Sequence, residues 1–426
     1  MIAEFSVENF RSFKEKCTFS LISTKDNKLS ESNAFESGKN LRFLKSAVIY
    51  GANASGKSNF FNALIFFLNF SVNSGPRKQI GDPIETEPFA LSKQTESAPS
   101  RFEIIFFIKD GDEEIRYRYG LAVSKERVEA EYLFAVNNVR EVTLFTRSLQ
   151  ETNYTSNFKE GARGKPSVRN NCTFLSVCAQ NNGEISALIV KYFRSITVLS
   201  GLYDQIIISK KEGSQPNYKK KIVDFLKNAD MQITNYKAES IPAFNDFPDP
   251  EVSELLKRKF PNAEQERILF GHTVYDNETP AGEKYLDGSV ESSGTRKLFS
   301  YSDDILGALE EGTPLFIDEF DTMLHPLIIE GIVKLFNSPI TNLKNAQFVI
   351  SCHAVNIMTN KLFRRDQIWF CEKDQYGATD LYSLVEYKEP VRKDASYNKN
   401  YLQGKYGAIP YLNEILLQTG LENNGG

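Results

Sequence analysis

The pattern of hydrophobic and polar positions predicts mainly strands over the first 135 residues or so. Short apolar runs separated by charged or Asp-Gly turns are typical of strands. One segment breaks this pattern: between about Lys57 and Leu68, apolar residues recur at helical spacing, which predicts a helix. The predicted strands cover residues 1–7, 47–50, 102–108, 114–123 and 128–136.

Residues from about 286 to 385 follow a different pattern, in which helices and strands alternate. Such alternation indicates a largely parallel sheet covered by helices. We expect a helix after each of Ser292, Pro326 and Val355, and strands over 315–317, 347–351 and 367–371.

The stretch between these parts, residues 140–285, has helical patterns at 183–193 and 218–227 and a strand pattern at 268–275. Its segment 241–261 is rich in Pro, Asn and Asp and predicts a loop with a short helix. We interpret the stretch as a mainly helical insertion.

The sequence thus predicts an α/β protein with a mixed and parallel sheet, flanking helices, an antiparallel β subdomain and an inserted α+β region. The predicted domains are residues 1–139, 140–285 and 286–426, the last including a C-terminal segment.

Composition narrows the class of protein. The net charge of -4 weighs weakly against a dedicated non-specific nucleic-acid binder, which is usually basic. The five cysteines form no CxxC pair, which fits a reducing compartment, and three histidines are too few for a His-rich metal site. The chain has no signal-peptide pattern and no apolar stretch of membrane-spanning length. We therefore expect a cytoplasmic protein that does not enter a membrane.

The clearest chemical motif is a glycine-rich loop that follows an apolar strand and precedes a helix. Its spacing matches G-x-x-x-x-G-K-[ST], the phosphate-binding loop of ATP- and GTP-binding proteins. Its backbone N–H groups and the helix N-terminus would surround phosphate oxygens. Lys57 would supply a cation for the β- and γ-phosphates and Ser58 a hydroxyl for Mg²⁺. The predicted nucleotide-binding residues here are Gly51, Asn53, Ala54, Ser55, Gly56, Lys57, Ser58 and Asn59.

Two later strand ends carry groups that would complete an ATPase site. The apolar run Leu315–Ile317 ends in Asp318 and Glu319. Asp318 would hold Mg²⁺ through water, and Glu319 would polarise the attacking water. A second strand delivers His353, which would contact the γ-phosphate. Acidic residues and a single histidine at strand ends are also common without such a role, so their order along the chain after the glycine-rich loop carries the assignment.

Two further segments are candidates for nucleotide contacts. Ser292, Ser293 and Gly294 precede a predicted helix, where a hydroxyl and N–H groups can face an anion. The alternative is a simple helix N-cap. Arg11, just after the first strand, would reach the phosphates, unless it is an ordinary surface arginine.

The order of these motifs resembles the ABC/SMC-like ATPases of prokaryotic defence, the abortive-infection and RloA type, which are related to the ATPase half of the OLD nucleases. The resemblance covers most of the chain. It rests on ENFRSF (8–13), GANASGKSN (51–59), EPFAL (87–91), KNAD (227–230) with Ile233, ESSGT (291–295), FIDEFDTMLHP (316–326), AQFVISCH (346–353) and YLQGKYGAIP (401–410).

The resemblance implies an ABC-type head that binds ATP and Mg²⁺ and forms a head-to-tail homodimer or a higher oligomer. Each nucleotide would lie between Lys57 of one subunit and Ser292 or Ser293 of the other. His325 would lie where ABC proteins cross the dimer interface, and His272 is expected to be structural. Two features depart from the ABC pattern. Ser293 replaces a glycine of the transporter signature, and the Q-loop glutamine has only Gln79 and Gln94 as candidates.

Three functions can be weighed from the sequence. The first is an ATPase switch in antiviral defence that controls a separately encoded effector, such as a TOPRIM-like nuclease. Because only about 40 residues follow Val385, we expect no TOPRIM domain in this chain. The alternative is a RecF-like ATPase of DNA repair or recombination, which would bind DNA itself. A scaffold without turnover is a third option, against which the presence of Glu319 argues.

Overall fold

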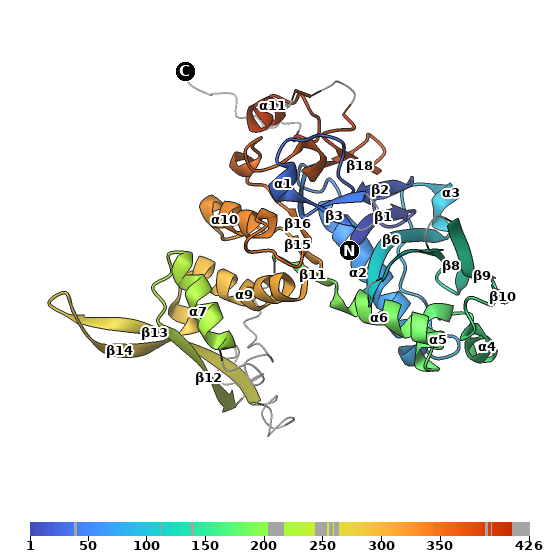
Figure 1. Ribbon diagram of the computed structural model, residues 1–426, viewed down its shortest axis with the longest axis horizontal. Helices are drawn as coiled ribbons and strands as arrows, with labels where there is room; N and C mark the ends of the chain where they lie inside the picture. The colour runs from blue at the N-terminus through green and yellow to red at the C-terminus, as the bar shows by residue number, and fades with distance from the viewer. Residues whose placement is uncertain are drawn as a thin grey trace, which may run out of the picture. The chain divides into compact units, whose positions relative to one another are not determined.

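A computed structural model of the chain describes residues 1–37, 41–111, 113–137, 140–202, 217–242, 264–387, 391–392 and 394–410, together with positions 254 and 259 (Figure 1). The chain divides into two units. The first consists of Met1–Ser200, Ala308–Asp321 and Ile329–Gly426, and the second of Gly201–Gly307 and Thr322–Ile328. The domain boundaries expected at residues 139 and 285 stay a prediction. Most of segment 241–261 lies outside the described residues.

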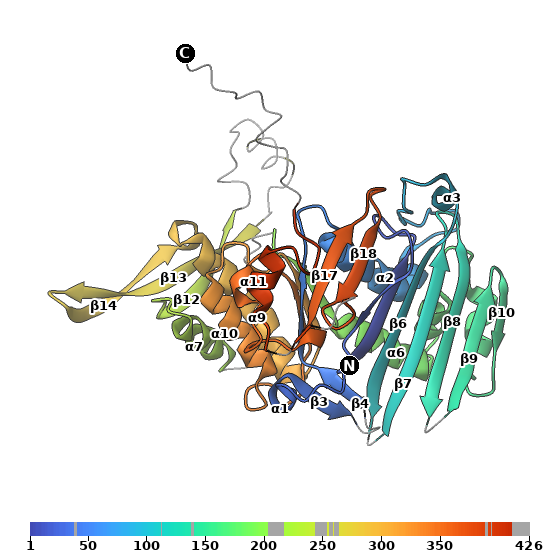
Figure 2. The same cartoon turned by 90° about the horizontal axis from the view of Figure 1, so that it is seen from above.

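The first unit contains an antiparallel sheet formed largely by the N-terminal part of the chain (Figure 2). Its long strands alternate in direction, and each of β6 to β9 pairs with the strand that follows it in the sequence. On its other side, β6 pairs with β1 from the start of the chain. This sheet confirms the expected antiparallel β subdomain. In spatial order its strands are β10 (Glu151–Tyr154), β9 (Arg140–Ser148), β8 (Val128–Asn137), β7 (Glu113–Val123), β6 (Ser100–Asp110), β1 (Ile2–Glu8) and β2 (Cys17–Ser20).

A second sheet of the first unit is mainly parallel, as the alternation of helices and strands predicts. Only its edge strand β18 runs antiparallel to its neighbour. Because the parallel strands share one direction, their carboxyl ends meet at one edge of the sheet. In spatial order the strands are β11 (Thr197–Ser200), β15 (Leu315–Asp318), β16 (Phe348–Ser351), β5 (Ser46–Tyr50), β17 (Ile368–Lys373) and β18 (Thr379–Ser383).

Helix α2 (Lys57–Arg77) packs between the two sheets and contacts β1 of one and β11 and β15 of the other. Its phenylalanines supply this contact: Phe60 and Phe67 lie 5.9 and 5.7 Å from the ring of Phe5, and Phe61 lies 6.4 Å from the ring of Phe316. These large buried rings fix the start of the helix relative to the parallel sheet. The apolar spacing predicted the helix, which extends beyond the expected end at Leu68.

The described part of the first unit also contains further helices and a two-stranded sheet of β3 and β4. The described part of residues 140–285, expected to be mainly helical, contains strands β9 to β14 beside its helices. The remaining elements of the first unit are α1 (Ser30–Asn33), β3 (Ala34–Ser37), β4 (Leu41–Leu44), α3 (Lys93–Glu96), α4 (Gly161–Gly164), α5 (Phe174–Gln180), α6 (Glu184–Ser195), α10 (Pro326–Asn337, which begins in the second unit) and α11 (Tyr397–Leu402).

The helix expected after Val355 is wrong. The chain makes a single 3-10 turn there, Val355–Ile357. The carbonyl of Met358 accepts the backbone N–H of Asn398, so it bonds to another segment in place of a helical partner. A short apolar pattern could not reveal this tertiary bond.

The described part of the second unit includes a three-stranded antiparallel sheet, helix α7 (Tyr218–Asn228) and the start of α9 (Ser293–Glu311). The sheet consists of β12 (Asn235–Pro242), β13 (Glu264–Asp276) and β14 (Thr279–Asp287). Phe299 of α9 lies 4.9 Å from the rings of both Tyr236 and Phe270, so the helix packs on β12 and β13.

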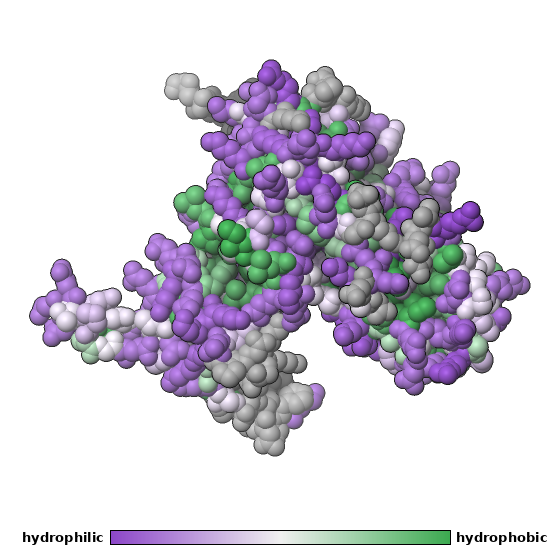
Figure 3. Space-filling model, viewed as in Figure 1, coloured by the Kyte–Doolittle hydropathy of each residue, from purple (hydrophilic) through white to green (hydrophobic). Residues whose placement is uncertain are grey.

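The surface shown in Figure 3 is mainly hydrophilic. Among the described residues, none of the helices combines the length and the apolar character needed to cross a lipid bilayer. All five cysteines are buried and free.

Candidate active site

The glycine-rich loop lies between buried strand β5 and the N-terminus of α2. Its second glycine, Gly56, has a φ of 111°, which L side chains rarely adopt. A Cβ added there would lie 2.3 Å from Oγ1 of Thr379, and one added at Gly51 would lie 2.4 Å from the carbonyl oxygen of Cys371. Both positions therefore need glycine, because neighbouring strands approach the loop closely.

The side chain of Lys57 is buried and folds back over this loop. Its Nζ donates to the carbonyl oxygens of Gly51 at 2.8 Å and Ala52 at 3.1 Å. Burial lowers the pKa of Lys57, whereas the nearby Cys371, Asp318 and other acidic groups oppose that shift. The ammonium of Lys57 thus lies near the acidic end of β15.

Ser351, a residue to which the motifs assigned no role, fixes the end of β15 through two hydrogen bonds. Oγ of Ser351, at the end of β16, donates to Oδ1 of Asp318 at 2.5 Å and accepts the backbone N–H of Glu319 at 2.7 Å. Ser351 is fully buried, and Asp318 is 6% exposed. One hydroxyl therefore orients both acidic residues, and the parallel register of β15 and β16 places it there.

We expect Ser351→Ala to slow ATP turnover by roughly ten- to a hundredfold, the range seen when groups that orient ligating residues are removed. The variant leaves the Glu319 N–H and one Asp318 oxygen without their partner. ATP affinity should change by only a few-fold, since the loop around Lys57 is untouched. Turnover and binding are measured separately, by phosphate release and by titration calorimetry.

Ser100→Ala is the matched control, because Ser100 is also fully buried and loses one hydroxyl hydrogen bond, the one it shares with Thr86. It should lower stability without lowering turnover. Equal turnover of Ser351→Ala and the parent protein would contradict the positioning role.

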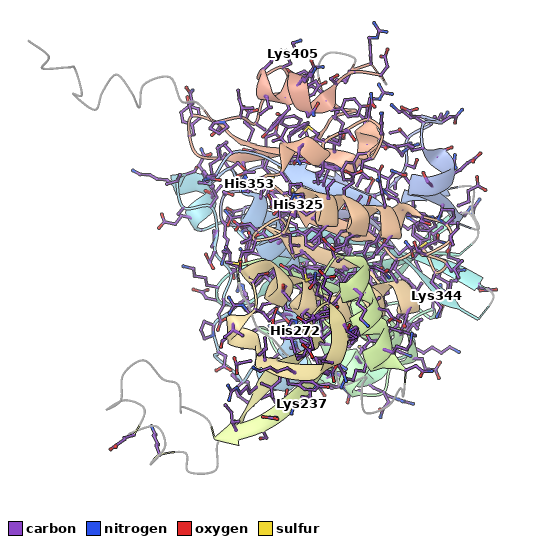
Figure 4. The ribbon with its side chains drawn as sticks, turned by 90° about the vertical axis from the view of Figure 1, so that its left-hand side faces the viewer. Lys237, His272, His325, Lys344, His353 and Lys405 are labelled. Carbon is purple, nitrogen blue, oxygen red and sulfur yellow. The ribbon has the colours of Figure 1, made fainter. Side chains whose placement is uncertain are left out.

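His353 follows β16 and lies beside the glycine-rich loop, with which it lines a common cavity. Its backbone N–H donates to Oδ2 of Asp321 at 2.8 Å, which ties the residue after β16 to the segment after β15. Figure 4 labels its side chain. The parallel sheet thus brings Asp318, Glu319 and His353 to one edge, as their positions at strand ends predict, and Lys57 begins the helix that follows the loop at the same edge.

The cavity has a volume of about 830 Å³. Its wall includes residues near the C-terminus, to which the motif analysis assigned no nucleotide contact. The lining residues are Tyr50, Gly51, Ala52, Asn53, Ala54, Ser55, Cys352, His353, Val355, Cys371, Glu372, Lys373, Tyr401, Leu402, Ala408, Ile409 and Pro410.

The C-terminal wall of the cavity packs against β17 and against β5, the strand that precedes the glycine-rich loop. The ring of Tyr401 stacks on Phe370 of β17 at 5.4 Å and lies 6.0 Å from Tyr50, the last residue of β5. The hydroxyl of Tyr401 donates to the carbonyl of Ala408 at 2.9 Å and so holds the loop that follows. Residues 401–410 therefore form a fixed side of the cavity.

Two predicted nucleotide contacts have other partners in the structure. The guanidinium of Arg11 forms an ion pair with Glu87 at 2.8 Å, and Arg11 does not line the cavity. Nδ2 of Asn59 donates to Oγ of Ser12 at 2.8 Å. Ser12 also accepts from Oγ1 of Thr379, so this small network holds the loop in place from the side of the first strands. A role for Arg11 at the nucleotide stays a prediction.

Ser292, Ser293 and Gly294 lie in the second unit, at the start of α9. Oγ of Ser292 accepts the backbone N–H of Thr295 at 3.0 Å, which is the N-cap bond weighed as the alternative. A Cβ added to Gly294 would lie 3.0 Å from the carbonyl oxygen of Met323, so this turn packs closely on the segment 322–328.

The other two histidines also lie in the second unit. Nε2 of His272, in β13, lies 2.7 Å from Oε1 of Glu291, so it braces the segment before α9, in keeping with the structural role expected for it. Nδ1 of His325 accepts the backbone N–H of Leu327 at 3.2 Å.

Neither candidate for the Q-loop glutamine, Gln79 or Gln94, is among the residues that line the cavity. The described residues contain no group of three or more His, Cys, Asp or Glu side chains that could hold a metal ion. A metal ion bound with ATP would instead use one hydroxyl and one carboxylate, as expected from Ser58 and Asp318.

Comparison with known protein families identifies the family of the chain. A family model described as "AAA domain, putative AbiEii toxin, Type IV TA system" matches residues 46–171 and 194–359, which is more than half of the chain. The chain belongs to this family. The expected P-loop ATPase domain is thereby confirmed, and both Lys57, at the start of α2, and Asp318, at the end of β15, lie within the matched ranges.

Comparisons with curated protein sequences and with solved structures say less about the family of this chain. No curated protein sequence matches the chain. Among solved structures, the SMC head domain from Thermotoga maritima is similar with a TM-score of 0.43 and 13% sequence identity, covering 90% of this chain and 98% of that chain.

Proposed function

We propose that this protein binds and hydrolyses ATP with Mg²⁺, dimerises when ATP is bound, and thereby switches a separately encoded effector in antiviral defence. The observation that carries the proposal is the sheet edge at which Asp318, Glu319 and His353 end neighbouring strands, with the Lys57 ammonium, at the start of α2, close to both carboxylates. Phosphoryl transfer depends mainly on positioning and on electrostatic stabilisation, which this edge can supply.

The loop suits a phosphate ligand. The hydroxyl of Ser55 is buried and has no hydrogen-bond partner within the described residues, so a donor is left for an anion. Lys57, now bonded to the loop carbonyls, would turn its ammonium to the β- and γ-phosphates. Ser58 and Asp318 would hold Mg²⁺, which neutralises charge on the phosphates. Glu319 would orient and polarise the attacking water, and His353 would contact the γ-phosphate.

The dimer is proposed because Ser292–Gly294 form a helix N-terminus in a separate unit of the chain. N–H groups at a helix N-terminus suit an anion. In a head-to-tail pair, these residues would face the nucleotide held by Lys57 of the other subunit. ATP would then stabilise the pair by bridging it, and hydrolysis would release it.

The effector is proposed to be a separate protein, such as a TOPRIM-like nuclease, because ATP binding can only bias an equilibrium that another site uses. The family description refers to a toxin of a type IV TA system, which supports a setting in defence. Such a switch would act in the cytoplasm.

Co-expression with the adjacent genes, followed by size-exclusion chromatography, tests this function. We expect a co-eluting effector, and we expect Glu319→Gln to change the composition of the complex because it prolongs the ATP state. Absence of a co-eluting partner, together with tight ATP-dependent binding of duplex DNA by the isolated protein, would favour a RecF-like repair function. Glu330→Gln, a carboxylate on α10 paired with Lys334, is the control.

A further inference from the structure

The end of β17 borders the nucleotide cavity although none of the motifs predicts it. β17 lies directly beside β5 and runs parallel to it, with Phe370 opposite Tyr50. Lys373 and Asn53 each follow three residues later, so both leave the sheet at the same edge. Lys373 lines the cavity together with the glycine-rich loop and His353.

The position of Lys373 relative to the loop is fixed by hydrogen bonds. Its strand partner in β18 is Thr379, whose Oγ1 donates to the carbonyl oxygen of Ser55 in the loop at 2.8 Å. Side chains two residues apart on a strand share a face, so Lys373 projects on the same side as Cys371. Cys371 lies close enough to Lys57 to influence it electrostatically. Lys373 therefore projects toward the side of the sheet that holds Lys57.

The charge of Lys373 is not neutralised by its neighbours. Within the described part of the chain its ammonium has no ion pair or hydrogen bond. The flanking carboxylates are engaged elsewhere: Glu372 accepts the hydroxyl of Tyr382 at 3.1 Å, and Asp374 accepts the backbone N–H groups of Tyr376 and Ala378. An exposed lysine is usually just solvated, but this one is left free at the rim of a phosphate-binding cavity.

We propose that Lys373 is a second cation for the terminal phosphate of ATP, and that it makes the site prefer nucleoside triphosphates to diphosphates. The inference rests on the proposed function. Lys373 lines the same cavity as Asn53 of the loop and as His353, the residue proposed to contact the γ-phosphate. A γ-phosphate there lies within the reach of a lysine side chain, and a diphosphate ends short of it.

The C-terminal wall supports this arrangement. Leu402, Ile409 and Pro410 present apolar side chains to the same cavity. Apolar walls exclude water, and a charge pair gains strength when less water surrounds it. Gly407 fits this wall closely: with a φ of 71°, it lies where an added Cβ would meet Oε2 of Glu372 at 2.7 Å. The wall therefore also braces the end of β17 that carries Lys373.

The test compares the affinities of β,γ-imido-ATP, which is not hydrolysed, and ADP by titration calorimetry. We expect Lys373→Gln to weaken the triphosphate about tenfold, the loss typical of one hydrogen bond to a charged group, and to leave ADP within about twofold. Lys373→Arg should restore most of the triphosphate affinity. Lys344→Gln is the matched control, because Lys344 is exposed and lies well apart from His353 (Figure 4).

Equal weakening of both nucleotides, or unchanged triphosphate affinity, would overturn the role of Lys373 while leaving the proposed function intact, provided that Lys57→Ala still abolishes binding. If the parent protein bound neither nucleotide, the proposed function itself would fail, and this inference with it. Thermal unfolding of the nucleotide-free variants shows whether they fold as the parent does.

Discussion

Glu319→Gln is expected to bind ATP but to hydrolyse it about 10²- to 10⁴-fold more slowly, the range typical for the loss of a general base. The amide keeps the size of the carboxylate and can still hold a water molecule, but it cannot accept a proton. The backbone of Glu319 has a φ of 50° and is fixed by the bond from its N–H to Ser351. Because that bond does not involve the side chain, the substitution should leave the strand end in place.

Single-turnover and steady-state phosphate release measure the effect, and calorimetry measures ATP affinity. Glu330→Gln removes one partly exposed carboxylate, which pairs with Lys334 on α10, and should hydrolyse ATP at the parent rate. Hydrolysis by Glu319→Gln at the parent rate would remove Glu319 from the reaction. A parallel loss of ATP binding would instead indicate that the carboxylate organises the loop.

Much of the site could be predicted because most of its residues follow the carboxyl ends of parallel strands. Apolar runs located β5, β15 and β16, and the residues after such runs in a parallel sheet must meet at one edge. The glycine-rich loop has a spacing that few other structures need. Lys57, Asp318 and His353 could thus be placed together without knowledge of the tertiary contacts between them.

The rest of the site depends on tertiary contacts that leave little trace in the pattern. Ser351 is one of many serines, and only the register of β15 and β16 brings its hydroxyl to both Asp318 and Glu319. A strand was expected near residues 367–371, but its place beside β5, which brings Lys373 to the cavity, is a matter of strand order. The block 401–410 reaches the cavity through aromatic stacking of Tyr401 on Phe370, which spacing along the chain does not predict.

Strands within residues 140–285 also depend on tertiary pairing that the sequence pattern does not reveal. β13 was recognisable by its strand pattern over 268–275, whereas β14 (Thr279–Asp287) is largely exposed and carries little apolar signal. Its pairing with β13 is what makes it a strand. Local polarity could not indicate this pairing.

Mixing two inactive variants is expected to restore activity if each site combines two subunits. Lys57→Ala should abolish ATP binding, because it removes the cation of the loop, and Gly294→Asp should block the facing helix N-terminus with a negative charge. A heterodimer of the two has one site with both defects and one site with neither. With random pairing in equal amounts, about a quarter of the parent activity should return, provided that the two sites of a symmetric dimer act independently.

The geometry of Gly294 makes a control necessary. A Cβ there would already approach the carbonyl of Met323 to 3.0 Å, so Gly294→Asp could perturb the turn as well as the charge. Gly331→Asp places the same side chain in α10, where an added Cβ meets nothing within 4 Å, and should remain active. Thermal unfolding then shows whether Gly294→Asp is folded.

Subunit exchange is established first, by mixing differently tagged parent chains and recovering both on one affinity resin. If exchange occurs and both variants are folded, a mixture as inactive as either variant alone would contradict the composite site. In that case Ser292–Gly294 would be only the N-cap of α9, as the bond from the Thr295 N–H to Ser292 by itself indicates. Restored activity, in contrast, requires that the intact Lys57 of one chain and the intact Gly294 of another act on the same nucleotide.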